Sequence, residues 1–369
     1  MTNSHEDRPT TPDPAKLYDV FSGCAYGDAW GNTNEFKSYA QLTKNSERGP
    51  ELPQQLIITD DTQMTLALAR AIDTAGPDNP DGIRAAIINE FIAWRSDPDN
   101  NRAPGNTCLR ATAALATGTP WTKATVVNSD GCGTVMRTSA AAFLPTHLWR
   151  PVAAWQAAVT HGKASGIAAT LIATAVIREA AQDTLSPGNA MGFAIELAAH
   201  PALRAGVGDW LAGHPHAATP EEADALLAAA LSELEADLRS ARNALPKFRD
   251  DPWHDDPCRY AGQGWRAQET LAIALLCVDA LPTSPIEALR RATVTNGDSD
   301  SIAAVAGAIL GALHPNPWPG EWAERLEPRY RSWISEAARY QLCASNAPPP
   351  APPGAIARPD LKGNLLAQH

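Results

Sequence analysis

The sequence predicts an all-α protein built as a single compact domain. Apolar residues recur at helical spacing through most of the chain, as Met64, Leu68 and Ile72 do at i, i+4 and i+8. The period-two alternation of strands is almost absent, and Asn296-Gly297 lies between helical segments rather than between β-branched runs. No repeat period is visible, which argues against a helical solenoid. About a dozen helices are therefore expected.

Composition restricts the class of protein. The chain has 369 residues, enough for a sizeable core, and a net charge of −11, which gives no basis for non-specific nucleic-acid binding. Six cysteines are scattered without a CxxC pair, so a reduced setting is expected and a zinc site is not. No signal peptide is recognisable, and no apolar run approaches membrane-spanning length. We expect a soluble, cytoplasmic monomer that binds no membrane.

The chain is expected to begin with a disordered tail, residues 1–14, followed by one domain over residues 15–344. A first helix runs from Lys16 to a break at residues 31–34, which leaves Glu35 in a loop. Small residues at Gly23, Ala25 and Gly27 would let this helix approach a neighbour closely.

The remaining elements follow in order. Helices are predicted over residues 59–75, 83–94 and 107–117, and over two runs between 149 and 181 that break at 160–162. Residues 126–137 contain Gly131 and Gly133, and helical sequence resumes at Val135. Later helices are predicted at 188–200, 219–242, 268–279, 285–293, 301–313 and 318–342, with an irregular stretch at 252–264. Residues 345–369 form a Pro-rich tail that cannot build a core.

Two clusters of carboxylates and hydroxyls each open an apolar helix. They comprise Thr59, Asp60 and Asp61 in the first case and Asp298, Asp300 and Ser301 in the second. Taken alone, each cluster is an acidic N-cap, which is a common structural feature. Together they look like two halves of a site for a hard cation, because oxygen-only ligands suit Mg²⁺ or Mn²⁺ rather than Zn²⁺.

Six motifs resemble those of the ADP-ribosylglycohydrolase family and occur in the family's order. They are GCAYGDAWGNTNEF (23–36), ITDDTQMTLALA (58–69), SDGCGTVMR (129–137), AVTHGKAS (158–165), GWRAQETLAIAL (264–275) and NGDSDSIAAVAGAILGAL (296–313). The resemblance implies an all-α, orthogonal multi-helix domain with a binuclear cleft for two divalent cations, Mg²⁺ or Mn²⁺. The implied reaction is hydrolysis of the bond between C1″ of ADP-ribose and an acceptor. An ADP-ribosylated substrate would bind, and ADP-ribose would be released.

Carried over position by position, the resemblance implies metal ligation by Thr59, Asp60, Asp61, Asp298, Asp300 and Ser301. Many relatives have Thr where Ser301 stands, which is an equivalent oxygen donor. The catalytic candidates are Glu35, Asp60, Asp61 and Asp300. Glu35 matches a loop glutamate near the scissile bond, where a carboxylate can orient or deprotonate water. Alternatively, Glu35 only positions the substrate, or is a surface carboxylate.

The ADP-ribose site is implied to comprise Ser129, Asp130, Gly131, Cys132, Gly133 and His161. Glycines there would let backbone N–H groups approach phosphate. The family often has Asn in place of Cys132, and Asp130 varies, so the substrate contacts stay open. Cys132 is alternatively a buried, unreactive residue. His161 either orients the substrate or only holds its loop.

Two interpretations are open for four further residues. Trp265 and Glu269 match a family motif that serves packing. Trp253 and Tyr260 are the alternative candidates for the wall of an adenine pocket.

Two other functions remain open. One is a non-catalytic ADP-ribose-binding protein, as in lens-protein relatives that have lost metal ligands. The other is a binuclear hydrolase of phosphoesters, suggested by the adjacent pair His254-Asp255, although further histidines at helical spacing are missing. The acceptor cannot be read from the sequence, so arginine, serine, a nucleobase and a small molecule all remain possible.

Overall fold

The computed structural model describes residues 13–76 and 79–340. Nearly all of the predicted N-terminal tail and the whole Pro-rich tail lie outside this part of the chain. Helix α1 (Pro14–Asn32) begins one residue before the expected domain boundary, because the Asp13 carboxylate caps it by accepting the N–H of Ala15 at 2.9 Å.

The described residues contain helices and isolated bridges but no strand, so the all-α prediction is confirmed. The longer helices after α1 are α3 (Asp60–Ala75), α4 (Pro80–Arg95), α5 (Asn106–Ala116), α7 (Trp149–Ala158), α8 (Ala164–Ala181), α9 (Ala190–Ala198), α11 (Pro220–Arg242), α14 (Ala267–Ala280), α15 (Pro285–Thr293), α16 (Ser299–Leu313) and α18 (Pro328–Tyr340). Shorter helices are α2 (Tyr39–Leu42), α6 (Trp121–Ala124), α10 (Val207–Leu211), α12 (Leu245–Asp250), α13 (Cys258–Ala261) and α17 (Gly320–Arg325). The 3₁₀ helices are η1 (Cys132–Thr134), η2 (Thr138–Phe143) and η3 (Pro201–Arg204).

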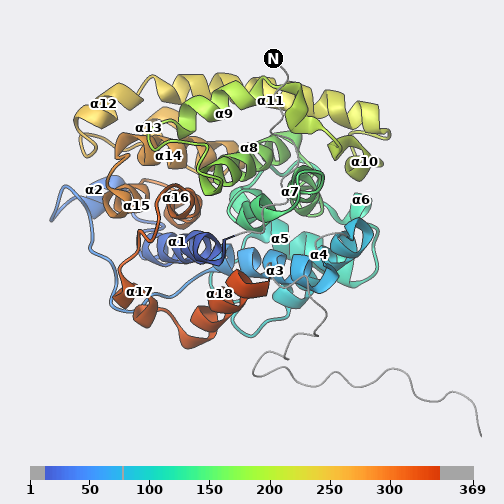
Figure 1. Cartoon of the computed structure of the whole chain (residues 1–369), viewed down its shortest axis with the longest axis horizontal. Coiled ribbons are helices and arrows are strands. Elements are labelled where there is room, and N and C mark those ends of the chain that lie inside the picture. Colours follow the sequence, from blue (N-terminus) through green and yellow to red (C-terminus); the bar gives the residue numbers. More distant parts are fainter. Residues whose placement is uncertain (1–12, 77–78, 341–369) are drawn as a thin grey trace, which may run out of the picture.

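Helices α1 and α16 lie side by side in the middle of the molecule (Figure 1). On one side, α8 and α14 pack against α16, and the long α11 covers α8, α9 and α14. On the other side, α1 contacts α3 and α18, and α4 packs on α3. Both α1 and α16 are buried along most of their length, which explains why their sequences show no polar face.

Glycines bring the backbones of α1 and α16 into direct contact. A Cβ atom on Gly27 would lie 2.0 Å from the carbonyl oxygen of Ala303, and one on Gly307 would lie 2.0 Å from that of Gly23. A Cβ on Gly31 would lie 2.4 Å from the Cα of Asp300. The prediction of close helix approach is therefore confirmed. This contact sets the C-terminal turns of α1 beside the first turn of α16.

Two element predictions were wrong. The helix expected over residues 318–342 is divided into α17 and α18, because Pro328 cannot continue a helix and disfavours helical backbone at Glu327. At the break, the Leu56 N–H donates to the carbonyl of Arg325 at 2.9 Å. The sequence from Val135 forms the 3₁₀ helix η2 instead of an α-helix.

Helix α8 corrects the expectation that no apolar run approaches membrane-spanning length. Its 18 residues have a mean hydropathy of 1.3, which suffices to cross a membrane by length and composition alone. In the structure, however, 78% of this segment is buried inside the protein. It packs against α7, α11, α14 and α16, as the core helix of a globular protein does.

Candidate active site

The two predicted acidic clusters open α3 and α16, and part of each cluster serves as a helix cap. The Thr59 hydroxyl accepts the Asp61 N–H at 3.4 Å, and the Asp298 carboxylate accepts the Ser301 N–H at 3.4 Å. The capping interpretation is therefore right for these two residues. Capping does not explain Asp61 and Asp300, which lie in the first turns of α3 and α16 and are buried.

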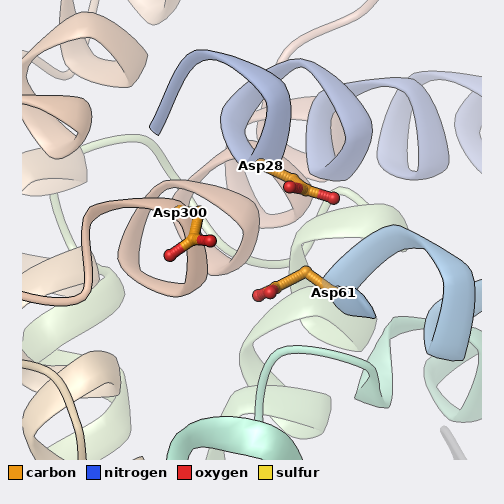
Figure 2. A group of neighbouring side chains, drawn as sticks. All are labelled: Asp28, Asp61 and Asp300. Atoms are coloured by element: carbon orange, nitrogen blue, oxygen red, sulfur yellow. The ribbon is translucent and has the colours of Figure 1, made fainter. Parts of the chain in front are cut away.

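Carboxylates from three helices converge on one space (Figure 2). Oxygens of Asp28, Asp61 and Asp300 lie within 4.8 Å of one another, and so do oxygens of Glu35, Asp298 and Asp300. Asp300 belongs to both groups, so the two are adjacent. The structure thus brings the two clusters together, although they are far apart in the sequence.

Asp28 is a site residue that the sequence reasoning missed. It lies on α1, is fully buried, and accepts the backbone N–H of Thr59 through both oxygens at 2.9–3.0 Å. It also accepts the Thr59 hydroxyl at 2.8 Å, and the N–H and hydroxyl of Thr62 at 3.1 and 2.5 Å. With both oxygens engaged by these donors, Asp28 fits a residue that orients Thr59 better than one that ligates an ion. The available signal was an acidic residue between the glycines of an apolar helix.

Asp61 has a buried carboxylate oxygen that lacks a hydrogen-bond partner among the described residues. Its Oδ1 is buried and has no hydrogen-bond partner in the described part of the chain. Its Oδ2 lies 3.2 Å from the Thr59 hydroxyl, whose hydrogen is also within reach of Asp28. One oxygen of Asp60, Oδ2, accepts the Gly105 N–H at 3.2 Å, and Asp60 belongs to neither carboxylate group, although its charge interacts with those of Asp28 and Asp298.

The electrostatics of the site disfavour a full set of ionised carboxylates without a counter-ion. Burial, followed by the charge of Asp298, raises the pKa of Glu35 to about 8. Burial also raises the pKa of Asp60 to about 7, and it raises the pKa values of Asp61 and Asp300 well above their ordinary range. Such a cluster is stabilised either by bound protons or by bound cations.

Glu35 lies in the predicted loop after α1. Its neighbour Asn34 is buried and donates to the carbonyl of Thr293 at 2.9 Å, which anchors the loop to the end of α15. The next residue, Phe36, has a φ of 63° and is 75% exposed. Its ring stacks on that of Trp265, with centroids 6.1 Å apart. Trp265 is itself 42% exposed, and this ring contact lies at the surface rather than in the core.

The segment from Ser129 to Gly133 lies beside the acidic cluster and is tied to two neighbouring segments. The Cys132 N–H donates to the carbonyl of Trp265 at 3.1 Å, and the Lys163 N–H donates to that of Ser129 at 3.1 Å. The Asp130 carboxylate is engaged by the Lys163 ammonium at 2.6 Å and by the Ser165 hydroxyl at 3.1 Å.

Cys132 is partly exposed and lies beside Asp298. Burial, followed by the negative charges of Asp298 and Asp61, raises the pKa of its thiol well above the usual value. Such a thiol stays protonated and unreactive, although the residue is less buried than the alternative interpretation supposed.

His161 is buried directly beneath this segment. A Cβ atom on Gly131 would lie 3.3 Å from its Nε2, and one on Gly133 would lie 3.4 Å from the same atom. Burial, together with the charge of Arg137, lowers the pKa of His161 well below the usual value, so the imidazole is neutral.

The other residues singled out in the sequence make their contacts outside the two carboxylate groups. Trp253 packs with its ring beneath the Arg291 guanidinium, and the Tyr260 hydroxyl donates to Asp255 at 3.1 Å. Glu269 accepts the N–H groups of Gln263 and Gly264, which fixes the turn before α14.

Comparisons with known proteins agree with this architecture. A family model described as ADP-ribosylglycohydrolase matches residues 10–350. A search of curated proteins finds no match. Among solved structures, a chain described as "ADP-ribosylglycohydrolase-related protein complex" superposes with a TM-score of 0.56 at 23% sequence identity. The alignment covers 90% of this chain and 98% of that chain, so the likeness shows a common fold over the whole domain.

Proposed function

The chain belongs to the ADP-ribosylglycohydrolase family, and on that premise we propose that it hydrolyses the C1″ glycosidic bond between ADP-ribose and an acceptor in a metal-dependent reaction. Family membership supports a glycohydrolase of ADP-ribosyl compounds in general. The observation that carries the finer proposal is that two carboxylate groups share Asp300, and that one of them contains Asp61, whose buried Oδ1 has no partner among the described residues. The acceptor would be a protein side chain, a nucleobase or a small molecule.

The side chains at the cluster fit two divalent cations, Mg²⁺ or Mn²⁺. The proposed ligands are Thr59, Asp60, Asp61, Asp298, Asp300 and Ser301, all oxygen donors. The unpartnered Oδ1 of Asp61 supports this assignment, because a buried carboxylate oxygen needs a partner. The Thr59 hydroxyl and Asp61 Oδ2, which lie 3.2 Å apart, would together hold a cation, because both are oxygen donors. When bound, such cations polarise a water molecule or a substrate hydroxyl.

Glu35 is proposed to act directly on the reacting groups. Its carboxylate lies within 4.8 Å of those of Asp298 and Asp300, at the edge of the cluster and in a loop. From there it can orient the attacking water and take its proton, the role of a carboxylate in glycoside hydrolysis. Nearby cations would lower the pKa of Glu35 from its raised value and make the carboxylate available as a base.

The segment from residue 129 to 133, with His161 beneath it, is proposed to hold the diphosphate of ADP-ribose. Two glycines open the backbone to an anion, and the buried imidazole faces both of them. The Asp130 side chain is engaged by Lys163 and Ser165, so its proposed part is to hold the segment in place.

Two alternatives are less well supported. A phosphoester hydrolase of the His-Asp type would need His254 and Asp255 as ligands. Instead, the His254 ring contacts the carbonyl of Asp251, and Asp255 is paired with Arg259 at 3.2 Å. A binding protein without activity is disfavoured because all six proposed ligand positions carry oxygen donors.

The test is to incubate the purified protein with ADP-ribosylated arginine, serine and nucleobase substrates and a small ADP-ribosylated compound. Mass spectrometry would measure release of ADP-ribose and of phosphate, in Mn²⁺ and in excess EDTA. We expect ADP-ribose from at least one linkage, in Mn²⁺ only. Full activity in EDTA would exclude the metal mechanism, release of phosphate would favour the phosphoesterase, and binding of ADP-ribose without turnover of any linkage would favour the binding protein.

A further inference from the structure

Arg137 is a fully buried cation that lies behind the glycine segment and makes no ion pair in the described part of the chain. Its guanidinium donates to the side-chain oxygen and the carbonyl of Gln156, both at 2.6 Å, and stacks over the ring of Phe91. Its remaining strong contact is a hydrogen bond of 2.8 Å to the hydroxyl of Thr160. That hydroxyl in turn lies 2.8 Å from Nδ1 of His161.

The direction of the Thr160–His161 hydrogen bond follows from counting hydrogens. Arg137 can only donate, so it occupies one lone pair of the Thr160 oxygen. The single hydroxyl hydrogen must then go either to His161 Nδ1 or to the carbonyl of Ala157, which lies farther away at 3.3 Å. That carbonyl already accepts the N–H groups of Thr160 and His161 at 3.2 and 2.9 Å. The hydrogen therefore goes to Nδ1.

The direction of this hydrogen bond determines the tautomer of the His161 imidazole. A neutral histidine that accepts at Nδ1 carries its proton on Nε2. Nε2 makes no hydrogen bond within the described residues, and it faces Gly131 and Gly133. His161 is only 2% exposed, and its Nε2–H, a donor without a partner in the described part of the chain, points into the proposed diphosphate site.

We propose that Arg137 and Thr160 are positioning residues that fix His161 as the Nε2–H tautomer, so that Nε2–H donates a hydrogen bond to the diphosphate of ADP-ribose. The identity of the anion rests on the proposed function, whereas the tautomer does not. Backbone pairing keeps the donor in place, because the Val126 N–H donates to Thr160 and the Gly162 N–H donates to Val126, at 2.9 and 3.0 Å.

The tautomer is tested on the ligand-free protein by nitrogen-15 NMR of the histidine rings, with His161→Gln identifying the signals of His161. We expect a protonated Nε2 and an unprotonated Nδ1 in the parent and in Thr160→Ser, which keeps the hydroxyl. Thr160→Val should lose this preference. A protonated Nδ1 in the parent would overturn the proposal. Because this result comes from the parent protein, it can be obtained even if Thr160→Val does not fold.

The donor role is tested by calorimetric titration with ADP-ribose. Thr160→Val should bind about tenfold more weakly, equal to about 1.4 kcal/mol, because a hydrogen bond to a charged group is lost. Thr160→Ser should match the parent. So should Thr170→Val, a matched loss of a fully buried hydroxyl that bonds only to the Gly166 carbonyl of its own helix. Equal affinity of Thr160→Val and the parent would overturn the proposal.

If the parent does not bind ADP-ribose, the proposed function fails, and the same variants are titrated with inorganic pyrophosphate. Weaker binding of pyrophosphate by Thr160→Val alone would support the donor role of His161 for a different diphosphate. No binding of pyrophosphate by the parent, or equal binding by all variants, would overturn that role.

Discussion

The carboxylate of Asp28 on α1 accepts both the backbone N–H and the hydroxyl of Thr59, the residue that caps α3. Asp28 therefore satisfies an N–H group at the start of α3 and at the same time takes up the hydroxyl hydrogen of Thr59. One lone pair of that hydroxyl accepts the Asp61 N–H at 3.4 Å, and the other is left on the side of the Asp61 carboxylate, 3.2 Å away. A hydroxyl that donates away from a site can only accept within it, which is the state required of a metal ligand.

Asp28→Asn should weaken binding of Mn²⁺ about 10- to 100-fold, the usual effect of losing a group that orients a ligand. The amide nitrogen would face N–H and O–H donors, so the metal-free protein should also lose about 1–3 kcal/mol of unfolding free energy. Calorimetric titration and urea unfolding in EDTA measure the two effects.

Asp279→Asn is the matched control for Asp28→Asn. Asp279 is fully buried on α14, accepts the N–H groups of Ala190 and Met191 at 3.0 and 2.9 Å, and belongs to neither carboxylate group. It should lose stability without losing affinity for Mn²⁺. An equal loss of affinity in both variants would mean that Asp28 acts through stability alone.

The metal-free protein should become less stable as the pH rises from about 5 to 8. Burial raises the pKa of Glu35 from 4.5 to about 8 and that of Asp60 from 3.8 to about 7, so the folded state holds more protons than the unfolded state in this range. The free energy of unfolding then falls with pH, because stability rises with pH only where the unfolded state binds more protons.

Melting temperatures in EDTA at pH 5, 6, 7 and 8 measure this pH dependence. Saturating Mn²⁺ should remove the decline, because the cation replaces protons as the partner of the carboxylates. A melting temperature in EDTA that stays constant or rises between pH 5 and 8 would contradict the proposed cluster of protonated carboxyl groups.

Gly27→Ala should destabilise the fold by several kcal/mol. Its methyl group would lie 2.0 Å from the carbonyl oxygen of Ala303, and only a shift of α1 away from α16 can relieve the overlap. The same shift would separate Asp28 from Thr59 and so weaken binding of Mn²⁺. Gly192→Ala is the control, because nothing lies within 4 Å of its added Cβ and helix α9 should gain about 0.5–1 kcal/mol. Urea unfolding measures the stability of both variants. Equal stabilities of Gly27→Ala and Gly192→Ala would contradict direct backbone contact between α1 and α16.

Phe36→Gly should be about 1 kcal/mol more stable than Phe36→Ala. The φ of 63° at this position costs an alanine about that much and a glycine almost nothing. Both changes remove the exposed ring that stacks on Trp265 beside Glu35, so both should raise KM for the ADP-ribosylated substrate. Thermal unfolding and steady-state kinetics measure the pair. Greater stability of the alanine variant would show that the loop does not hold this backbone conformation in solution.

The sequence was sufficient to predict features that depend on local chemistry. Helices follow from apolar spacing, and the cap at Thr59 follows from a hydroxyl placed before an apolar run. The role of Asp28 could not be predicted in this way, because it depends on contact with a helix about thirty positions later in the chain. The exposure of Trp265 likewise depends on tertiary structure. The break before Pro328, in contrast, was readable from the proline itself.

Asp300 belongs to both carboxylate groups. Asp300→Asn should remove most of the activity and weaken binding of Mn²⁺, because the change replaces a charged ligand shared by both halves of the proposed centre. It should also remove one of several buried like charges, so the metal-free variant should melt no lower than the metal-free parent. In the parent, Mn²⁺ at a hundredfold excess over Kd should add about 2.7 kcal/mol to the free energy of unfolding, and the variant should gain less. Near-parental turnover, or parental affinity for Mn²⁺, would exclude Asp300 from the centre. A lower melting temperature in EDTA would instead show that this carboxylate stabilises the fold through contacts other than a cation.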